Sequence, residues 1–236
     1  MHFERLPRAV GKHYTVTTMA RYKVIMLDFD GTIARTIPAI LHASRKMLNM
    51  HGYEVDPVQV ERNFGLALPE AFRCFANNPN IDDATMEQMI VEFNTIYKNE
   101  CEPLIELFDG VAETLDTLHK AGVTLLIASN NIRNVLNRLT ARLNIDKYFD
   151  GIVCADDVVN AKPAPDIALL ALERYGAKGS EALVVGDSTF DMDMGRGADC
   201  DLCGVSFGSH TPEMLREKGA RYVIDHFSEL RKIALE

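Results

Sequence analysis

From Tyr22 onward, the chain alternates short apolar runs with stretches whose apolar residues recur at helical spacing. This alternation is typical of βαβ units, in which crossover helices cover both faces of a parallel sheet. Strands that are buried on both faces can be almost entirely apolar, as these runs are. We therefore predict an α/β fold built on a doubly wound parallel sheet. The predicted strands are residues 24–27, 124–128, 152–154, 183–185, 202–207 and 222–224.

The segment from Ile37 to about Pro103 breaks the alternation. It contains no good strand pattern but three or four helical patterns, whereas the other predicted helices are single crossovers, such as one from Asp109 as N-cap to Gly122. We therefore predict an all-helical domain inserted into the sheet domain, with connecting segments at residues 34–36 and 104–108. The predicted divisions are a leader at 1–21, the core at 22–36 and 106–236, and the insert at 37–105.

Composition limits the partners that this chain can have. It has 236 residues and a formal net charge of −9, from 25 Lys and Arg against 34 Asp and Glu. An acidic protein is a poor counterion for nucleic-acid phosphates or anionic lipid, so we predict neither kind of partner. No stretch approaches the roughly 20 apolar residues of a membrane-spanning helix.

Cysteine usage and the N-terminal residues bear on the compartment. Five scattered cysteines suit reduced thiols in a cytoplasmic protein better than a disulfide framework. Cys200 and Cys203 have C-x-x-C spacing but no second pair, so we interpret them as ordinary small side chains. Residues 1–21 lack the apolar core of a secretory signal, and we interpret them as a loose leader upstream of an internal start at Met19, with a short targeting peptide as the alternative.

Polar side chains follow the predicted strands directly, where ligands of open α/β sheets bind. They are Asp28-Phe29-Asp30-Gly31-Thr32, Ser129-Asn130, Lys162 in the loop after the third strand, and Gly186-Asp187-Ser188-Thr189-Phe190-Asp191. Four carboxylates at one sheet edge would repel one another unless a cation lay among them. Oxygen donors point to a hard ion, Mg²⁺ before Zn²⁺ or Ca²⁺, so Mg²⁺ is the predicted cofactor.

The same residues predict a phosphoryl-transfer site. Asp28 and Asp187 are the best candidate metal ligands, with the backbone carbonyl of Asp30 as a third. Lys162 and Ser129 add donors that suit phosphate oxygens. Each motif is weak by itself, because Asp-x-Asp-Gly and Lys-Pro are also common loop sequences. Their occurrence in order at successive strand ends is the informative observation.

In this ordered set, the sequence resembles the haloacid dehalogenase superfamily of phosphohydrolases, whose four motifs it matches over nearly the whole chain after residue 22. The resemblance implies a Rossmann-like core with an inserted helical cap. Residues 65–72 of the insert, and the closing stretches at 204–208 and 219–225, resemble the phosphoglycolate phosphatase and pyrophosphatase branch. A small phosphorylated metabolite, phosphoglycolate-like or pyrophosphate-like, is the implied substrate.

The resemblance also implies roles for single residues. Asp28 is the implied nucleophile, which forms an aspartyl-phosphate, and Asp30 is the implied general acid and base. Gly31 allows the sharp turn beside them. The remaining implied residues are Ser129, Asn130, Lys162, Gly31 and Thr32 for the phosphate, Asp28, Asp30 and Asp187 for the metal, and Asp191, Ser188 and Arg35 in support.

Arg35 departs from the family pattern, in which an acidic or small residue is common near this position. We expect either a solvated residue of the connecting segment or a contact to a second anionic group of the substrate. His210 is expected on a surface loop.

Several alternatives remain open. A sugar phosphomutase of the β-phosphoglucomutase type uses the same nucleophile, and a non-catalytic phosphate-binding module on this fold is a third reading. A 2-haloacid dehalogenase is disfavoured because its halide leaving group needs no proton donor, whereas Asp30 is present. A phosphonatase is disfavoured at the same position, where its relatives resemble Asp-x-Ala. The oligomeric state is left open.

Overall fold

The computed structural model describes residues 20–236, so the predicted leader, with its proposed start at Met19, lies almost wholly outside the described residues. Within them, six strands form one sheet in which every pairing is parallel. The predicted doubly wound parallel sheet is therefore confirmed. The strands are β1 (Val24–Leu27), β2 (Thr124–Ser129), β3 (Gly151–Cys154), β4 (Ala182–Gly186), β5 (Asp201–Val205) and β6 (Tyr222–Ile224).

The strand order, β3-β2-β1-β4-β5-β6, reverses direction at β1. Leu27 at the end of β1 is paired with Ile127 in β2 and with Val185 in β4. Since the chain connections leave this point in opposite directions, the loops after β1 and β4 diverge and leave a crevice at the carboxyl edge of the sheet. This crevice is where an open α/β sheet binds its ligand.

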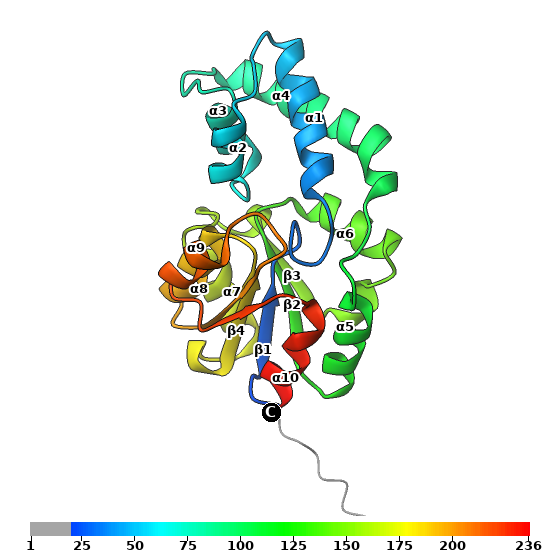
Figure 1. Ribbon diagram of the computed structural model, residues 1–236, viewed down its shortest axis with the longest axis vertical. Helices are drawn as coiled ribbons and strands as arrows, with labels where there is room; N and C mark the ends of the chain where they lie inside the picture. The colour runs from blue at the N-terminus through cyan, green and yellow to red at the C-terminus, as the bar shows by residue number, and fades with distance from the viewer. Residues whose placement is uncertain (1–19) are drawn as a thin grey trace, which may run out of the picture.

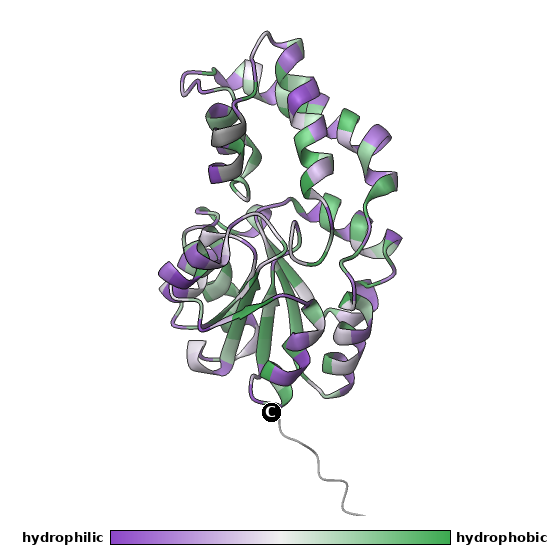
Figure 2. Ribbon diagram, in the orientation of Figure 1, coloured by the Kyte–Doolittle hydropathy of each residue, from purple (hydrophilic) through white to green (hydrophobic). Residues whose placement is uncertain are grey.

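Helices cover both faces of the sheet (Figure 1). In β1, Ile25 and Leu27 belong to the core beneath one layer, whereas Val24 and Met26 belong to the core beneath the other. Figure 2 shows the strands as strongly hydrophobic and the helices as mixed, as expected for elements with one face in water. The first layer holds α5 (Val111–Lys120), α6 (Arg133–Arg142) and α10 (Leu230–Leu235), and the second holds α7 (Asp166–Tyr175), α8 (Thr189–Gly197) and α9 (Pro212–Glu217). Short 3₁₀ turns are η3 (Asp146–Tyr148), η4 (Ala155–Asp157), η5 (Gly179–Glu181) and η6 (Phe227–Glu229).

Between β1 and α5, the chain forms a helical segment that lies over the carboxyl edge of the sheet (Figure 1). Its core contains an aromatic group in which Phe93 lies 5.3 Å from Phe72 and 5.6 Å from Tyr97 between ring centroids. Apolar side chains at helical spacing explain why this segment packs as a bundle. It consists of α1 (Ile37–Met50), α2 (Pro57–Asn63), α3 (Leu68–Phe75), α4 (Asp83–Ile96), the π-helical turn η1 (Tyr97–Cys101) and the 3₁₀ turn η2 (Glu102–Leu104).

The two segments that join the helical segment to the sheet are paired with each other. Ala34 and Leu107 form an isolated antiparallel bridge. The backbone N–H of Arg35 donates to the carbonyl oxygen of Glu106 at 2.8 Å. The chain therefore leaves the sheet and returns to it at one place, close to the connecting segments predicted from the sequence.

Two local predictions are wrong. Helix α5 begins at Val111 with Gly110, not Asp109, as its N-cap. Gly110 has a φ of 77°, a left-handed conformation that glycine adopts readily, and Asp109 instead lies 3.2 Å from the guanidinium of Arg35. Strand β5 ends at Val205 rather than at Phe207.

The five cysteines are all free thiols. Cys200 is half-buried and Cys203 is buried, and neither is in a disulfide among the described residues. None of the helices between residues 20 and 236 combines the length and the hydrophobicity that crossing a bilayer requires.

Candidate active site

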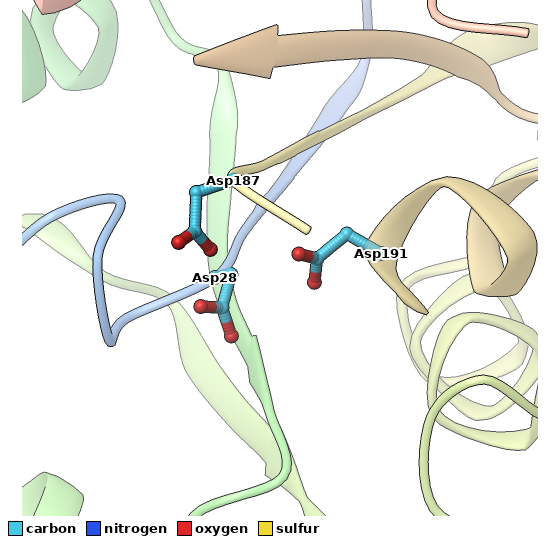
Figure 3. Close-up of side chains that lie close together, drawn as sticks. All are labelled: Asp28, Asp187 and Asp191. Carbon is cyan, nitrogen blue, oxygen red and sulfur yellow. The ribbon is translucent and has the colours of Figure 1, made fainter. Parts of the chain in front are cut away.

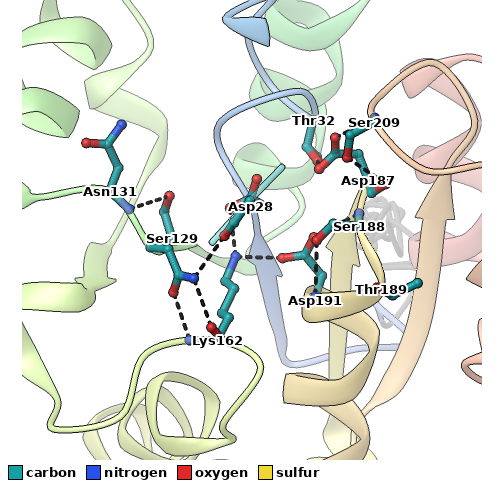
Figure 4. Close-up of polar contacts among 12 residues, drawn as sticks. Asp28, Thr32, Ser129, Asn131, Lys162, Asp187, Ser188, Thr189, Asp191 and Ser209 are labelled. Atoms are coloured by element: carbon teal, nitrogen blue, oxygen red, sulfur yellow. Dashed lines mark hydrogen bonds and ion pairs between the residues drawn. The ribbon is translucent and has the colours of Figure 1, made fainter. Parts of the chain in front are cut away.

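Polar side chains from four separate parts of the chain meet at the carboxyl edge of the sheet (Figure 4). Asp28 directly follows β1, Ser129 ends β2, and Asp187 directly follows β4. They meet because the carboxyl ends of parallel strands lie on one edge. The loop before α7 supplies Lys162, and the first turn of α8 supplies Asp191.

Lys162 is the centre of this group. Its Nζ donates to Oδ1 of Asp28 at 2.7 Å and to Oδ1 of Asp191 at 2.6 Å. The side chains of Lys162 and Asp191 are each only 2% exposed. Burial by itself would lower the pKa of Lys162, but Asp191 and Asp28 outweigh it and raise that pKa. The lysine is therefore a buried ammonium group that is paired with two carboxylates.

Three carboxylates, those of Asp28, Asp187 and Asp191, lie close together (Figure 3), and two of them contact this lysine. One carboxylate oxygen from each of Asp28, Asp187 and Asp191 lies within 4.8 Å of the others. Burial raises the pKa of Asp28, and the charges of Asp191 and Asp187 raise it further against the opposing effect of Lys162. Burial, followed by the charge of Asp191, raises the pKa of Asp187 to about 7. One lysine does not balance this much negative charge, so the donor set fits a hard divalent cation.

The carboxylate group differs in one member from the predicted metal ligands. Asp191 lies in it, and the side chain of Asp30 does not. The predicted donor of Asp30 was its backbone carbonyl, so this difference leaves that prediction open.

Asp187 is enclosed by two glycine-containing loops. Oγ1 of Thr32 donates to Oδ1 of Asp187 at 3.4 Å, and the backbone N–H of Ser209 donates to Oδ2 at 2.8 Å. Gly31 has a φ of 83°, and a Cβ at this position would lie 2.3 Å from Oδ2 of Asp187. A Cβ at Gly208 would lie 2.1 Å from Cβ of the same aspartate. Both loops can close on Asp187 only because they lack a side chain at these two points.

Asp191 is oriented by the start of its own helix. Oγ of Ser188 donates to Oδ2 of Asp191 at 2.6 Å, and the Ser188 N–H donates to the same oxygen at 3.1 Å. This is a capping box at the N-terminus of α8. With Oδ2 held in this way, Oδ1 faces Lys162. Ser188 and Asp191 thus fix the position of the lysine.

Asp30 lies beside the carboxylate group but has different contacts. Nδ2 of Asn131 donates to Oδ2 of Asp30 at 3.0 Å. Burial raises the pKa of Asp30, although the hydrogen bond from Asn131 opposes it. A carboxyl group with a raised pKa can hold a proton at a pH where an exposed aspartate would be ionised.

The amide of Asn130 links three parts of the site. Its Oδ1 accepts from the backbone N–H of Lys162 at 2.8 Å, and its Nδ2 donates to the carbonyl oxygens of Lys162 at 3.0 Å and Gly65 at 2.9 Å. The neighbouring Ser129 is buried, and its Oγ accepts from the N–H of Asn131 at 3.2 Å. Asn130 therefore holds the loop of Lys162 against the helical segment.

Arg35 lies apart from the other predicted site residues. Its guanidinium carbon is 4.6 Å from the centroid of the Phe108 ring, and its Nη2 is 3.2 Å from Oδ1 of Asp109. The side chain is 48% exposed. It does not line the cavity that opens on Asp28 and Asp30.

Four residues of the site were not predicted, namely Asn131, Gly208, Ser209 and His210. His210 is only 3% exposed, so its predicted surface position is wrong, and its Nδ1 accepts from the N–H of Thr189 at 3.0 Å. Residues 208–210 lie in the loop that begins after β5 ends at Val205. Attention to every strand end would have found them, as it would have found Asn131 after β2.

The fold and the position of these residues define an α/β enzyme with its charged groups at the carboxyl edge of a doubly wound sheet. Residues 25–205 match the haloacid dehalogenase-like hydrolase family. The chain belongs to this family and is a hydrolase, which confirms the resemblance seen in its motifs.

Similar proteins agree with this assignment. The chain is 30% identical to a phosphoglycolate phosphatase from Pseudomonas syringae pv. syringae, over 89% of this chain and 78% of that protein. It is 29% identical to the pyrophosphatase PpaX from Bacillus velezensis, over 92% and 98% of the two chains. The crystal structure of a haloacid dehalogenase-like hydrolase from Bacteroides fragilis superposes with a TM-score of 0.81 at 29% identity, covering 89% of this chain and 99% of that one.

Proposed function

We propose that this hydrolase is a Mg²⁺-dependent phosphatase that cleaves a small phosphorylated metabolite through an aspartyl-phosphate intermediate. The observation that carries the proposal is the position of Lys162 between Asp28 and Asp191, beside the carboxylate of Asp187. A buried cation and a metal-binding carboxylate group next to one nucleophilic oxygen suit a phosphoryl group. The phosphatase names of the relatives support the same reaction.

Asp28 and Asp30 would divide the chemistry. A carboxylate oxygen of Asp28 forms a bond to phosphorus while the bond from phosphorus to the alcohol oxygen breaks. Asp30 gives its proton to that leaving oxygen, and then accepts a proton from the water that hydrolyses the aspartyl-phosphate. The raised pKa of Asp30 supports the first of these steps, because the acid must be protonated before the alcohol leaves.

The residues around Asp28 would hold the phosphoryl group. Lys162 and Ser129 are the expected donors to its oxygens, with Gly31 and Thr32 forming the turn beside it. Asn130 contributes by holding the backbone of Lys162. Asp28, Asp187 and the carbonyl of Asp30 are the proposed ligands of Mg²⁺, which when bound supplies positive charge to the transferring phosphoryl group.

We propose further that residues 37–105 act as a cap over a core formed by residues 22–36 and 106–236. The position of the helical segment over the carboxyl edge supports this division (Figure 1). A cap that closes would exclude water while Asp30 transfers its proton. The free thiols of the described chain fit action in the reducing cytoplasm.

Release of phosphate from p-nitrophenyl phosphate tests the proposal. We expect Mg²⁺-dependent release that EDTA abolishes and added Mg²⁺ restores. Asp28→Asn keeps the shape of the side chain and should lower kcat by several orders of magnitude. Asp116→Asn is the matched control, because Asp116 forms a surface ion pair with Lys120 and should leave kcat unchanged.

The intermediate and the acceptor can be tested separately. Rapid quenching at low pH followed by intact-protein mass spectrometry should detect one added phosphoryl group in the wild type and none in Asp28→Asn. Full activity in metal-stripped enzyme, or a fully active Asp28→Asn variant, would refute the assignment. Transfer of the phosphoryl group to a second sugar hydroxyl without release of phosphate would identify a phosphomutase instead.

A further inference from the structure

The cavity that opens on the catalytic carboxylates is largely apolar. It has a volume of about 360 Å³, and Asp28, Asp30 and Ser129 line it. This volume lies at the lower end of the range of small-molecule sites, about 300–1,000 Å³. Most of the remaining wall comes from the helical segment, whose aliphatic and aromatic contributors include Ile40, Phe64, Leu66, Phe75, Ile90 and Phe93.

The charged residues that line this cavity are all acidic. They are Asp28, Asp30 and Glu70, and no lysine, arginine or histidine of the described chain is among the lining residues. Arg35 is not among them either: its guanidinium lies over the ring of Phe108 and beside Asp109. A second anionic group on a substrate, such as a carboxylate or another phosphate, would be desolvated there without a positive partner. That desolvation is costly.

Binding an uncharged apolar group in this cavity is favourable, because it carries no such desolvation cost. Phe93 and Phe64 are each no more than 5% exposed, so a hydrocarbon placed against them is removed from water. The cavity is continuous with the site of phosphoryl transfer, because residues of both line it. The alcohol half of a phosphate ester bound to Asp28 would therefore lie between these apolar walls.

We infer, on the basis of the proposed function, that the substrate is a phosphate monoester of an uncharged, mainly apolar alcohol, of alkyl or aryl type. The relatives named after phosphoglycolate and pyrophosphate act on compounds that carry a second anionic group. The cavity of this chain has apolar side chains where such a group would need a cation.

A series of n-alkyl phosphates tests the inference directly. Ethyl, butyl and hexyl alcohols have similar acidity, so the intrinsic reactivity of their phosphates is nearly constant along the series. One methylene in an apolar pocket changes kcat/KM by about tenfold or more. We expect kcat/KM to rise at least tenfold from ethyl to hexyl phosphate, and hexyl phosphate to exceed both phosphoglycolate and pyrophosphate.

Adjacent residues of α4 provide a matched pair of variants. Ile90 is half-buried and lines the cavity, whereas Val91 is 65% exposed and does not. Ile90→Lys should lower kcat/KM for hexyl phosphate by about tenfold or more and should raise it for phosphoglycolate. Val91→Lys should change neither value. Circular dichroism and thermal unfolding establish that both variants are folded.

The outcomes separate this inference from the proposed function. If p-nitrophenyl phosphate is hydrolysed but phosphoglycolate or pyrophosphate exceeds every alkyl ester, the proposed phosphatase stands and the apolar substrate class is wrong. A flat alkyl series would also overturn the inference. If no phosphate ester is hydrolysed, the proposed function fails and this inference fails with it. Should Ile90→Lys not fold, Ile90→Ala with the hexyl ester replaces it, and an unchanged kcat/KM would count against the apolar wall.

Discussion

Replacing Lys162 by methionine removes a positive charge from the centre of the site while keeping the length of the side chain. Lys162 donates to Asp28 at 2.7 Å and to Asp191 at 2.6 Å, and its side chain is 2% exposed. The variant would leave two buried carboxylates without their shared cation. Removing one partner from a buried ion pair generally costs about 3–5 kcal/mol of the free energy of unfolding.

We therefore expect Lys162→Met to lower the free energy of unfolding by about 3–5 kcal/mol near pH 7.5 without metal. The titration of the lysine itself should not change this loss between pH 6 and 9. A lysine with a raised pKa contributes its full stabilisation below its unfolded pKa of about 10.4, and loses it only as the pH rises through the higher folded value. We also expect kcat to fall by roughly 10²–10³, the usual effect of removing one electrostatic donor from an active site.

Urea denaturation followed by circular dichroism measures the stability change. The control compares Lys162→Met and Asp191→Asn with the double variant that carries both changes. In the double variant, only the carboxylate of Asp28 is left without the lysine, because the side chain at position 191 is neutral. The loss in the free energy of unfolding of the double variant should be smaller than the sum of the two single losses by about 1–3 kcal/mol. A loss below about 1 kcal/mol in Lys162→Met, or strictly additive effects in the double variant, would refute the view that Lys162 is a buried counterion.

Three further predictions concern the loop, the pH and the connecting segment. Gly31→Ala should lower kcat by about 100-fold in steady-state assays, because its Cβ would meet Asp187 at 2.3 Å; an active variant would contradict the enclosed position of that carboxylate. With a pKa raised from 3.8 to about 7, Asp187 should make the metal-free protein less stable as the pH rises from about 4 to 7, so Mg²⁺ should raise Tm more at pH 8 than at pH 5. An equal rise at both pH values would count against Asp187 as a ligand. Arg35→Ala should leave KM for p-nitrophenyl phosphate and phosphoglycolate within about twofold, because Phe108 and Asp109 hold the guanidinium outside the cavity; a selective rise for phosphoglycolate would restore Arg35 as a substrate contact.

The sheet and much of the site could be predicted because both follow from local patterns. Strands buried on both faces are continuous apolar runs, and their carboxyl ends share an edge in a parallel sheet. Asp28, Ser129 and Asp187 therefore had to lie near one another. Lys162 was harder to place, since it comes from a loop, and its position depended on the order of the motifs rather than on a local pattern.

The remaining features depend on contacts between distant segments. Ser209 is 22 residues from Asp187, and no periodicity indicates that its N–H reaches that carboxylate. His210 was predicted on a surface loop, but its ring is buried and accepts a hydrogen bond from the backbone N–H of Thr189, which is 21 residues away. Arg35 became a substrate-contact hypothesis because sequence does not reveal that Phe108 and Asp109 pack beside it.

The apolar wall of the cavity could not be predicted for a related reason. Helical spacing identified the apolar faces of the insert, and such faces usually form a core. Phe93 has two roles, because it packs against Phe72 in the core and also lines the cavity. Which apolar residues remain accessible to a ligand depends on how the helices are spaced over the sheet edge.

The origin of the cavity walls has an evolutionary consequence. The carboxylates and the lysine come from strand ends, loops and a helix start of the sheet domain, whereas Ile40, Phe64, Ile90 and Phe93 all lie in the one continuous stretch of sequence between β1 and α5. That stretch enters and leaves the sheet at a single paired point, Ala34 with Leu107. Substitutions within this stretch can therefore change the walls of the cavity without changing the carboxylates and the lysine at the edge of the sheet. Under the proposed function, exchanging residues 37–105 between two such proteins should transfer substrate preference as a unit.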